Sequence, residues 1–189
     1  MSSSYTDQEK KLLLKIARDS IQYTLEGKLL NIQDNYTIPD HLFDYGATFV
    51  TLTKFGELRG CIGALEPSMP LVEDVRVHAI AAATQDYRFN PLVLDELPDI
   101  QIEISVIKPI GQINFASPDD LLQKINPYED GIIIEDGRHR ATFLPQVWEK
   151  IPNKEQFLSS LCLKLGATPD LWRSEKINVY RYGVEKLIE

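Results

Sequence analysis

The sequence has few of the residues that build thiol or imidazole sites: its 189 residues include only two cysteines and three histidines. Cys61 and Cys162 lie far apart in apolar surroundings, which in a reducing compartment favours two free thiols over a disulfide. His41, His78 and His139 are scattered and show none of the short ligand spacings typical of zinc sites. We therefore expect no metal site, and no motif indicates a cofactor.

Long hydrophobic runs and an excess of positive charge are also absent. The longest uncharged run, Pro109 to Pro118, is far shorter than the roughly 18 apolar residues needed to cross a bilayer. The amino terminus has no basic segment followed by an apolar run and a small-residue cleavage site, so we expect a cytoplasmic protein without a membrane partner. A net charge of −8 disfavours a nucleic-acid partner, although a local basic patch would remain compatible with one.

The order of the predicted elements indicates an α+β fold. A length of 189 residues suits one sizeable core or two small subdomains that share one. Apolar periodicity, capping residues and turn signals predict helices over residues 6–27, 70–86, 117–125 and 153–166 and strands over residues 46–53, 58–63, 99–108, 131–135, 138–144 and 177–182. Strands in hairpins mixed with helices are typical of α+β proteins rather than of a regular βαβ array.

The most informative segment is Arg59-Gly60-Cys61-Ile62-Gly63, in which one thiol stands between two glycines and beside a guanidinium. Glycine inside a strand marks a bend, a bulge or a close approach of other atoms, so the segment predicts a crowded and shaped spot. Arg59 would favour a thiolate at Cys61 if the two side chains converged. Because no Lys-Ser or Lys-Thr follows, we expect the glycines to meet backbone requirements rather than to hold phosphate.

Several interpretations of these side chains remain open. Cys61 is either a small packed side chain, a nucleophile or redox thiol, or the wall of a binding site. Arg59 either pairs with a carboxylate such as Glu103, which would fix two elements, or awaits an anion. On the helix that follows Pro70, the apolar stripe leaves Asp74 for solvent or for a cleft.

Six short motifs, taken in order, resemble those of one known family, the AMMECR-one domain, whose microbial members are called AmmeMemoRadiSam system protein A. The motifs are Leu58–Gly63, Asp86–Phe89, Asp95–Pro98, Ile102–Val106, Ala141–Trp148 and Trp172–Ser174. The resemblance covers roughly residues 6 to 185 and treats residues 1–189 as a single domain. It implies an α+β chain of two associated subdomains, the larger built on an antiparallel sheet with flanking helices.

The resemblance implies little about activity, because the family has no established reaction. Its microbial members are associated with a Memo-like protein and a radical S-adenosylmethionine protein, which are the partners that the resemblance implies. Two positions depart from the pattern of many microbial relatives: Tyr87 replaces a proline, and Ser160 replaces a histidine. A catalytic imidazole at that second position cannot exist here, and a serine is a poor general base near neutral pH.

Our first functional hypothesis is a binding domain for a small anionic molecule or a partner peptide. Its cleft would be floored by the segment that contains Arg59, Gly60, Ile62 and Gly63. The flanking side chains would be Arg88, Glu103 and Thr142.

The second hypothesis is an enzyme in which Cys61 attacks or relays, Arg59 or Arg88 stabilises negative charge, and Glu103 transfers protons. It lacks an obvious base unless His78 or His139 lies within about 3–4 Å of the Cys61 sulfur. The third hypothesis is a nucleic-acid-associated factor, which requires a continuous basic face.

Overall fold

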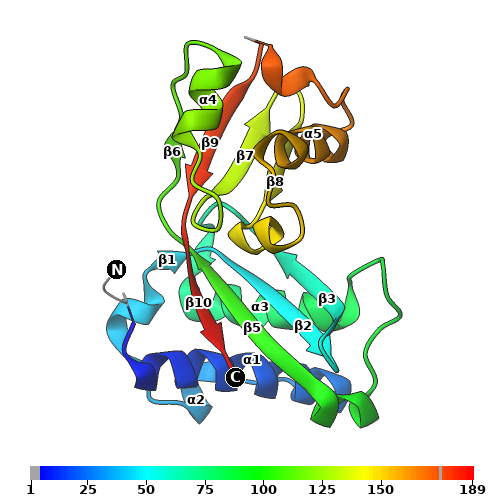
Figure 1. The fold of residues 1–189 in the computed structure, drawn as a ribbon. Helices are drawn as coiled ribbons and strands as arrows, with labels where there is room; N and C mark the ends of the chain where they lie inside the picture. Colours follow the sequence, from blue (N-terminus) through cyan, green and yellow to red (C-terminus); the bar gives the residue numbers. More distant parts are fainter. Residues whose placement is uncertain (1–4, 175) are drawn as a thin grey trace. The chain divides into compact units, whose positions relative to one another are not determined.

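The computed structural model describes residues 5–174 and 176–189, which fall into two compact units. Unit 1 contains the chain up to Ile107 together with Glu185–Glu189, and unit 2 contains Lys108–Val184. Each unit combines an antiparallel sheet with helices, so the predicted α+β class is confirmed (Figure 1).

Unit 1 is built on a four-stranded sheet in the order β10-β5-β2-β3, in which β2 runs antiparallel to both of its neighbours. The strands are β2 (Thr48–Lys54), β3 (Glu57–Gly63), β5 (Ile100–Ile107) and β10 (Val184–Ile188). The other elements are α1 (Asp7–Leu25), α2 (Ile32–Asn35), η1 (Asp40–Phe43), β1 (Tyr45–Gly46), β4 (Met69–Pro70), α3 (Leu71–Thr84) and η2 (Leu94–Asp99). In Figure 1, α3 passes behind β2 and β5.

The core of unit 1 is formed by the apolar stripe of α1 and by alternate residues of β2 and β5. In α1, Thr6 caps the first turn in a capping box with Glu9, and the apolar stripe that follows is buried, as the sequence predicts. In β2 and β5, every second side chain faces the helices. These strand residues are Val50, Leu52, Ile102, Ile104 and Val106. The opposite face of the sheet therefore carries the polar half of the alternation.

The hairpin of β2 and β3 contains a β-bulge. Leu52 pairs with Gly60 but Thr53 pairs with Leu58, so Arg59 is the extra residue on β3. A Cβ atom on Gly60 would lie 2.2 Å from the Ala82 carbonyl oxygen of α3, so only glycine fits under the helix. A Cβ atom on Gly63 would lie 2.3 Å from the Thr48 carbonyl oxygen. The close approach predicted from the glycines is thus a contact between backbones.

Asp74 corrects one expectation from the sequence, because it is buried rather than exposed. Its Oδ1 atom accepts a hydrogen bond from Thr48 Oγ1 at 2.6 Å and lies 3.1 Å from Nδ1 of His78, one turn along α3. Its Oδ2 atom has no hydrogen-bond partner among the residues that the structure describes. The apolar stripe of α3 is wide enough to include position 74, and the polar partner comes from the start of β2.

Unit 2 has its own four-stranded sheet in the order β6-β9-β7-β8, with antiparallel pairs throughout. Its strands are β6 (Gly111–Gln112), β7 (Gly131–Glu135), β8 (Arg140–Phe143) and β9 (Asn178–Tyr182). Its helices are α4 (Pro118–Lys124), η3 (Pro145–Glu149), α5 (Lys154–Leu165) and η4 (Leu171–Arg173). Ser117 and Asn153 cap α4 and α5, as predicted, whereas β6 and β10 were not predicted.

The core of unit 2 contains two tryptophans and a phenylalanine among aliphatic side chains. The rings of Trp148 and Phe157 stack with centroids 3.6 Å apart, and Nε1 of Trp148 donates to the Asp130 carbonyl oxygen at 2.8 Å. Cys162 of α5 is fully buried in the same cluster, and burial raises the pKa of its thiol. This thiol and both tryptophans therefore belong to the core of unit 2.

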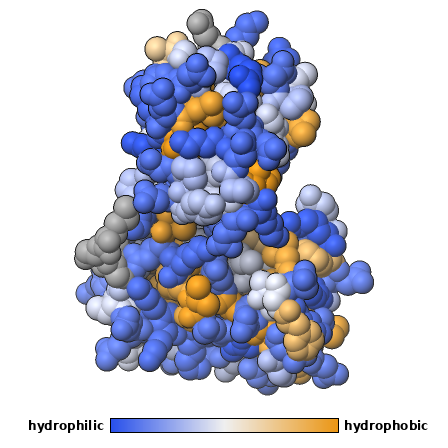
Figure 2. Space-filling model, viewed as in Figure 1, coloured by the Kyte–Doolittle hydropathy of each residue, from blue (hydrophilic) through white to orange (hydrophobic). Residues whose placement is uncertain are grey.

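None of the helices in the described part of the chain combines the length and the hydropathy that a bilayer crossing requires. On the face drawn in Figure 2, most side chains are hydrophilic and the hydrophobic ones gather in smaller areas between them.

Candidate functional site

Cys61 lies in the middle of β3, at one end of a line of polar side chains that crosses the sheet of unit 1. Thr51 of β2 pairs with Cys61 on one side and with Glu103 of β5 on the other. Beyond Glu103, Nζ of Lys186 in β10 lies 3.7 Å from Glu103 Oε1. Paired residues project to the same face of a sheet, so Cys61, Thr51 and Glu103 form one line. Lys186 joins this line through its contact with Glu103, and we call the four side chains the polar row.

The thiol and the hydroxyl of the polar row are in contact. Thr51 Oγ1 donates a hydrogen bond to Cys61 Sγ over 3.3 Å. The backbone N–H of Cys61 points away from β2, so Thr51 and Cys61 form a pair without mutual backbone bonds, in which side chains come closest. Cys61 is half-buried and is not part of a disulfide. Its thiol therefore lies at the β3 end of the row.

An ion pair closes the free edge of β3 beside Cys61. Asp86 Oδ2 accepts the backbone N–H of Cys61 at 2.8 Å and Nη2 of Arg88 at 2.6 Å, while Oδ1 accepts Nε of Arg88 at 2.9 Å. Nη2 of Arg88 also lies 3.4 Å from the Cys61 carbonyl oxygen. The carboxylate and the guanidinium thus replace the acceptor and the donor that a further strand would supply. We call this pair the edge clamp.

Both members of the edge clamp favour their ionised forms. Asp86 is only 5% exposed, and the hydrogen bonds from Arg88, with that from the Cys61 amide, hold the pKa of its carboxyl group well below the usual range. In turn, the Asp86 carboxylate raises the pKa of the Arg88 guanidinium. Both groups are therefore charged throughout the physiological range of pH.

Arg59 corrects a second expectation, because it pairs with Glu96 of η2 and not with Glu103. Its Nε and Nη2 atoms lie 3.2 and 2.9 Å from the Glu96 carboxylate, and Nη1 donates to the Asn90 carbonyl oxygen at 3.0 Å. Glu103 is out of reach because β2 separates β3 from β5. The bond from Arg59, supported by Lys54, lowers the pKa of Glu96 to about 2.

Among the ion pairs beside β3, cationic side chains outnumber carboxylates. The guanidinium carbons of Arg59 and Arg88 lie 6.0 and 5.5 Å from the centre of the Phe89 ring, within the range of cation–π contacts. The ion pairs around them join three cationic side chains, Lys54, Arg59 and Arg88, to two carboxylates, Asp86 and Glu96. This local surplus occurs in a chain whose net charge is −8.

The remaining predicted residues lie elsewhere. Ile62 packs against the core of unit 1, on the face opposite the polar row. Thr142 belongs to unit 2, where its Oγ1 donates to the Ile132 carbonyl oxygen at 2.9 Å. His78 faces Asp74, and His139 of unit 2 lies 3.5 Å from Asp136. Of the predicted site residues, the structure brings Cys61, Glu103 and Arg88 to the row and its edge.

Sequence reasoning missed Thr51, Lys186 and Glu96. A regular hairpin register would place Thr51 opposite Gly60. Only the bulge at Arg59 brings Thr51 opposite Cys61, so the sequence alone does not reveal this pair. No signal pointed to Lys186, because β10 itself was not predicted. In the described ranges, no group of three or more histidine, cysteine, aspartate or glutamate side chains is placed to hold a metal ion.

Comparison with known proteins gives one family. The model of the AMMECR1 family, which is the AMMECR-one domain, matches residues 14–187. Protein MJ0810 of Methanocaldococcus jannaschii is 39% identical over 187 residues, which cover 95% of this chain and 90% of that protein. A protein of Methanothermobacter thermautotrophicus is 41% identical over 183 residues, covering 94% of this chain and 92% of its own length.

A solved structure shares the fold. The crystal structure of the uncharacterized protein PH0010 from Pyrococcus horikoshii matches with a TM-score of 0.88 and 34% sequence identity. The match covers 96% of this chain and 91% of that chain. The names of these relatives state no activity.

Proposed function

The chain belongs to the AMMECR1 family, and from the geometry of its own residues we propose that it is a binding protein for a small anionic ligand. The ligand binds at the Cys61 end of the polar row, against the edge clamp. Arg88 provides the positive charge, and the polar row provides the groups that select the rest of the molecule.

The main support for this proposal is that Arg88, unlike Arg59, has hydrogen-bond donors that are still available to a ligand. The Arg59 side chain is 16% exposed and donates hydrogen bonds to Glu96 and Asn90. The Arg88 side chain is 43% exposed, and its Nη1 atom makes no hydrogen bond with any residue that the structure describes. A planar guanidinium with a free edge is well suited to a carboxylate or phosphate group.

The polar row supports a ligand of mixed polarity. Next to Arg88 it offers the Cys61 thiol and the Thr51 hydroxyl, and further along it offers the Glu103 carboxylate paired with the Lys186 ammonium. A few convergent polar groups of this kind fix the orientation of a small molecule. A ligand with an anionic group at one end and hydrogen-bonding groups at the other would use the whole row.

The experiment is a thermal-unfolding titration with phosphate, citrate and oxalate at constant ionic strength. Binding to the folded state alone stabilises it by about 2.7 kcal/mol when the ligand is at 100 times its Kd. We expect at least one anion to raise Tm in a concentration-dependent way, and Arg88→Gln to abolish that increment. Arg76→Gln, which removes an ion-paired arginine of α3, is the matched control and keeps the increment. An increment that survives in Arg88→Gln contradicts the proposal.

A second candidate function is favoured by the bond between Thr51 and Cys61. In this reading Cys61 is a nucleophile, and the Thr51 hydroxyl turns from the sulfur toward Glu103, its partner on the other side in the register of the sheet. The hydroxyl oxygen then accepts the thiol proton while the hydroxyl passes its own proton to the Glu103 carboxylate. Glu103 then supplies the base that the sequence lacked. Glu103→Gln should slow alkylation of Cys61 at neutral pH, whereas Glu57→Gln, at an exposed position of the same hairpin, should not. Equal rates in the two variants would exclude this role.

A further inference from the structure

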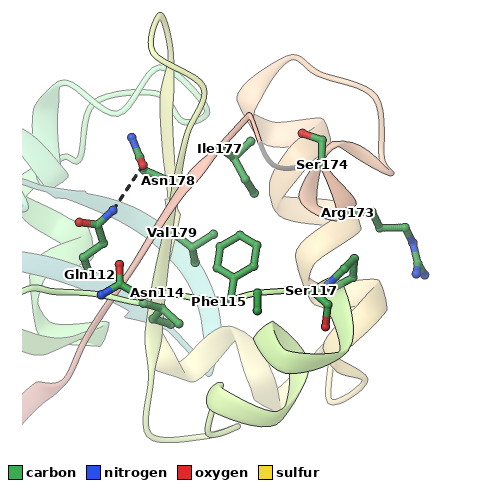
Figure 3. A pocket seen from close by; sticks show the side chains of 12 residues that line it. Gln112, Asn114, Phe115, Ser117, Arg173, Ser174, Ile177, Asn178 and Val179 are labelled. Carbon is green, nitrogen blue, oxygen red and sulfur yellow. Dashed lines mark hydrogen bonds between the residues drawn. The ribbon is translucent and has the colours of Figure 1, made fainter.

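Each unit has a hollow, and the two hollows differ in whether the groups that line them face one space. The hollow of unit 2, of about 600 Å³, is lined from both sides of β9. Figure 3 shows the amides of Gln112 and Asn178 on one side of that strand and the Phe115 ring on the other. The hollow of unit 1, of about 370 Å³, lies where β10 ends beside α1 (Figure 1), and its lining comes from one helix and one strand end.

β10 is the outermost strand of the sheet of unit 1, so in the described part of the chain one of its edges has no strand beside it. The Glu189 N–H donates to the Ile102 carbonyl oxygen of β5 at 3.2 Å, and the Gly183 carbonyl oxygen accepts the first N–H after β5 at 2.9 Å. Backbone groups of a strand alternate in direction, so Lys186 and Ile188 turn theirs toward the free edge. These are the groups with which a further strand would pair.

The hollow of unit 1 lies against this free edge. Ile188 and Glu189 form its strand side, and its helix side is formed by residues 11, 14, 15, 18 and 19 of α1. The helix positions recur every three or four residues, so they lie on one face of α1. Leu14 and the methylene stems of the cationic side chains make this face partly apolar. A strand added to β10 would therefore place its helix-side side chains in the hollow.

The more exposed charges around this edge are positive. The ion pairs along it are Lys10–Glu185, Lys15–Asp19, Arg18–Glu189 and Lys186–Glu103. In each pair the cationic side chain is the more exposed member, and the difference is largest for Lys15 and Asp19, at 63% and 22%. Lys11 adds an exposed cation that makes no ion pair with any residue that the structure describes. An incoming strand would therefore meet positive charge, although the chain has a net charge of −8.

This distribution of charge limits what can pair with the edge. A second copy of the chain would bring the same lysines to the same edge, and like charges destabilise a strand pair. Lysines on an edge strand protect many proteins from such self-pairing. An acidic segment would turn the same lysines into attractive contacts.

We propose that the free edge of β10 binds an extended acidic segment of a partner protein, which adds a strand to the sheet of unit 1. Its backbone pairs with Lys186 and Ile188. On the helix side, its side chains enter the hollow beside Leu14, where their carboxylates meet Lys11 and Lys15. On the other side, they meet Lys186. Strand addition of this kind takes affinity from main-chain hydrogen bonds and specificity from alternate side chains.

The test uses a fluorescein-labelled short peptide of alternating glutamate and valine, whose binding to the full chain is followed by fluorescence anisotropy. We expect saturable binding of this peptide and none of the peptide in which lysine replaces glutamate. Lys15→Glu should weaken binding about fivefold or more, because an attractive contact becomes repulsive. Lys28→Glu is the matched control, since Lys28 is equally exposed and also paired with a carboxylate but lies outside the lining.

Two further changes separate strand pairing from charge attraction alone. N-methylation of every second residue of the peptide blocks the backbone bonds of one edge only, so of the two alternate forms one should bind and the other should not. Ile188→Pro removes an N–H that points to the free edge, where proline is tolerated, and should weaken binding of the unmodified peptide.

The proposal is overturned if the acidic peptide does not bind at millimolar concentration, if the basic peptide binds equally well, or if both methylated forms bind. Equal effects of Lys15→Glu and Lys28→Glu also overturn it. So does a protein dimer that Ile188→Pro dissociates, because a second copy would then occupy the edge. Arg88→Gln should leave peptide binding intact, so this inference and the proposed anion site fail or succeed separately.

Discussion

The two cysteines of the chain lie in contrasting surroundings, one in each unit. Cys61 is on an edge strand, half-buried, bonded to a threonine hydroxyl and bordered by the edge clamp. Cys162 is on the buried stripe of α5, among aromatic and aliphatic side chains, and burial raises the pKa of its thiol. The same side chain is therefore a candidate for chemistry in one place and a packing element in the other, because neighbours decide which of the two it is.

The largest loss of stability is expected from a substitution in the buried cluster around Cys162. Trp148→Ala removes a ring stacked on Phe157 in the cluster that holds Cys162, and we expect the free energy of unfolding to fall by about 3–5 kcal/mol. Urea denaturation followed by circular dichroism measures the loss. Alkylation of Cys162 should become faster in the same variant. A loss below about 1 kcal/mol would mean that the cluster is less tightly packed than the structure shows.

Loss of the edge clamp beside Cys61 should also lower the free energy of unfolding. Asp86→Asn removes a buried charge that accepts bonds from Arg88 and the Cys61 amide, and we expect a loss of about 1.5–3 kcal/mol at pH 7. The pKa of Asp86 is lower in the folded than in the unfolded state, so its contribution is present above about pH 4, the unfolded value, and fades as pH falls below it.

The difference between wild type and Asp86→Asn should therefore shrink when urea denaturation is repeated near pH 2–3. Asp95→Asn, an exposed carboxylate nearby, is the control and should change little at either pH. A difference that stays constant with pH would show that the charge of Asp86 is not what stabilises the fold.

Replacing each cysteine by serine sharpens the comparison directly. Cys162→Ser places a hydroxyl group in a fully buried apolar site, at a cost of about 1–3 kcal/mol. Cys61→Ser should stay within about 0.5 kcal/mol of wild type, because a polar neighbour and solvent can bond the new hydroxyl. Chemical denaturation of the two variants in parallel measures the two losses in free energy of unfolding. Equal losses would remove the contrast on which the account depends.

A small effect on stability is expected from Thr51→Val, which keeps the shape of the side chain and removes one hydrogen bond, worth about 0.5–1.5 kcal/mol. A hydroxyl that donates to sulfur favours the thiolate, so alkylation of Cys61 should be slower in the variant at neutral pH. Thr53→Val, two residues along the same strand, is the control and should leave the rate unchanged. A Thr51→Val rate equal to wild type would show that the bond has no chemical consequence.

The fold was largely predictable because local signals agree with tertiary packing. Thr6, Ser117 and Asn153 begin helices where their capping geometry predicts them, and the burial of Ile100–Ile107 alternates as predicted up to Ile104, after which Ser105 is buried as well. β10 was missed because Val184–Ile188 is a short edge strand that contains two charged residues, and only pairing with β5 makes it a strand. Such pairing is a long-range effect that periodicity does not contain.

The site was only partly predictable, since its geometry depends on one bulge and on partners distant in sequence. The extra residue Arg59 shifts the register by one, which places Thr51 rather than Val50 opposite Cys61. The same bulge residue pairs with Glu96, 37 positions further along the chain. The motif therefore predicted a crowded segment of β3, whereas the partners of its side chains required the folded chain.

The most direct test is the pH dependence of iodoacetamide modification of Cys61 and Cys162 in the native protein, with each site read by peptide mass spectrometry. The account predicts that Cys61 reacts in the folded state and reaches its maximal rate below about pH 8.5, the ordinary pKa of a thiol, because positive charge lies around it. It predicts that Cys162 stays unmodified until the protein unfolds. A Cys61 that also waits for unfolding would contradict an accessible site at the end of the polar row.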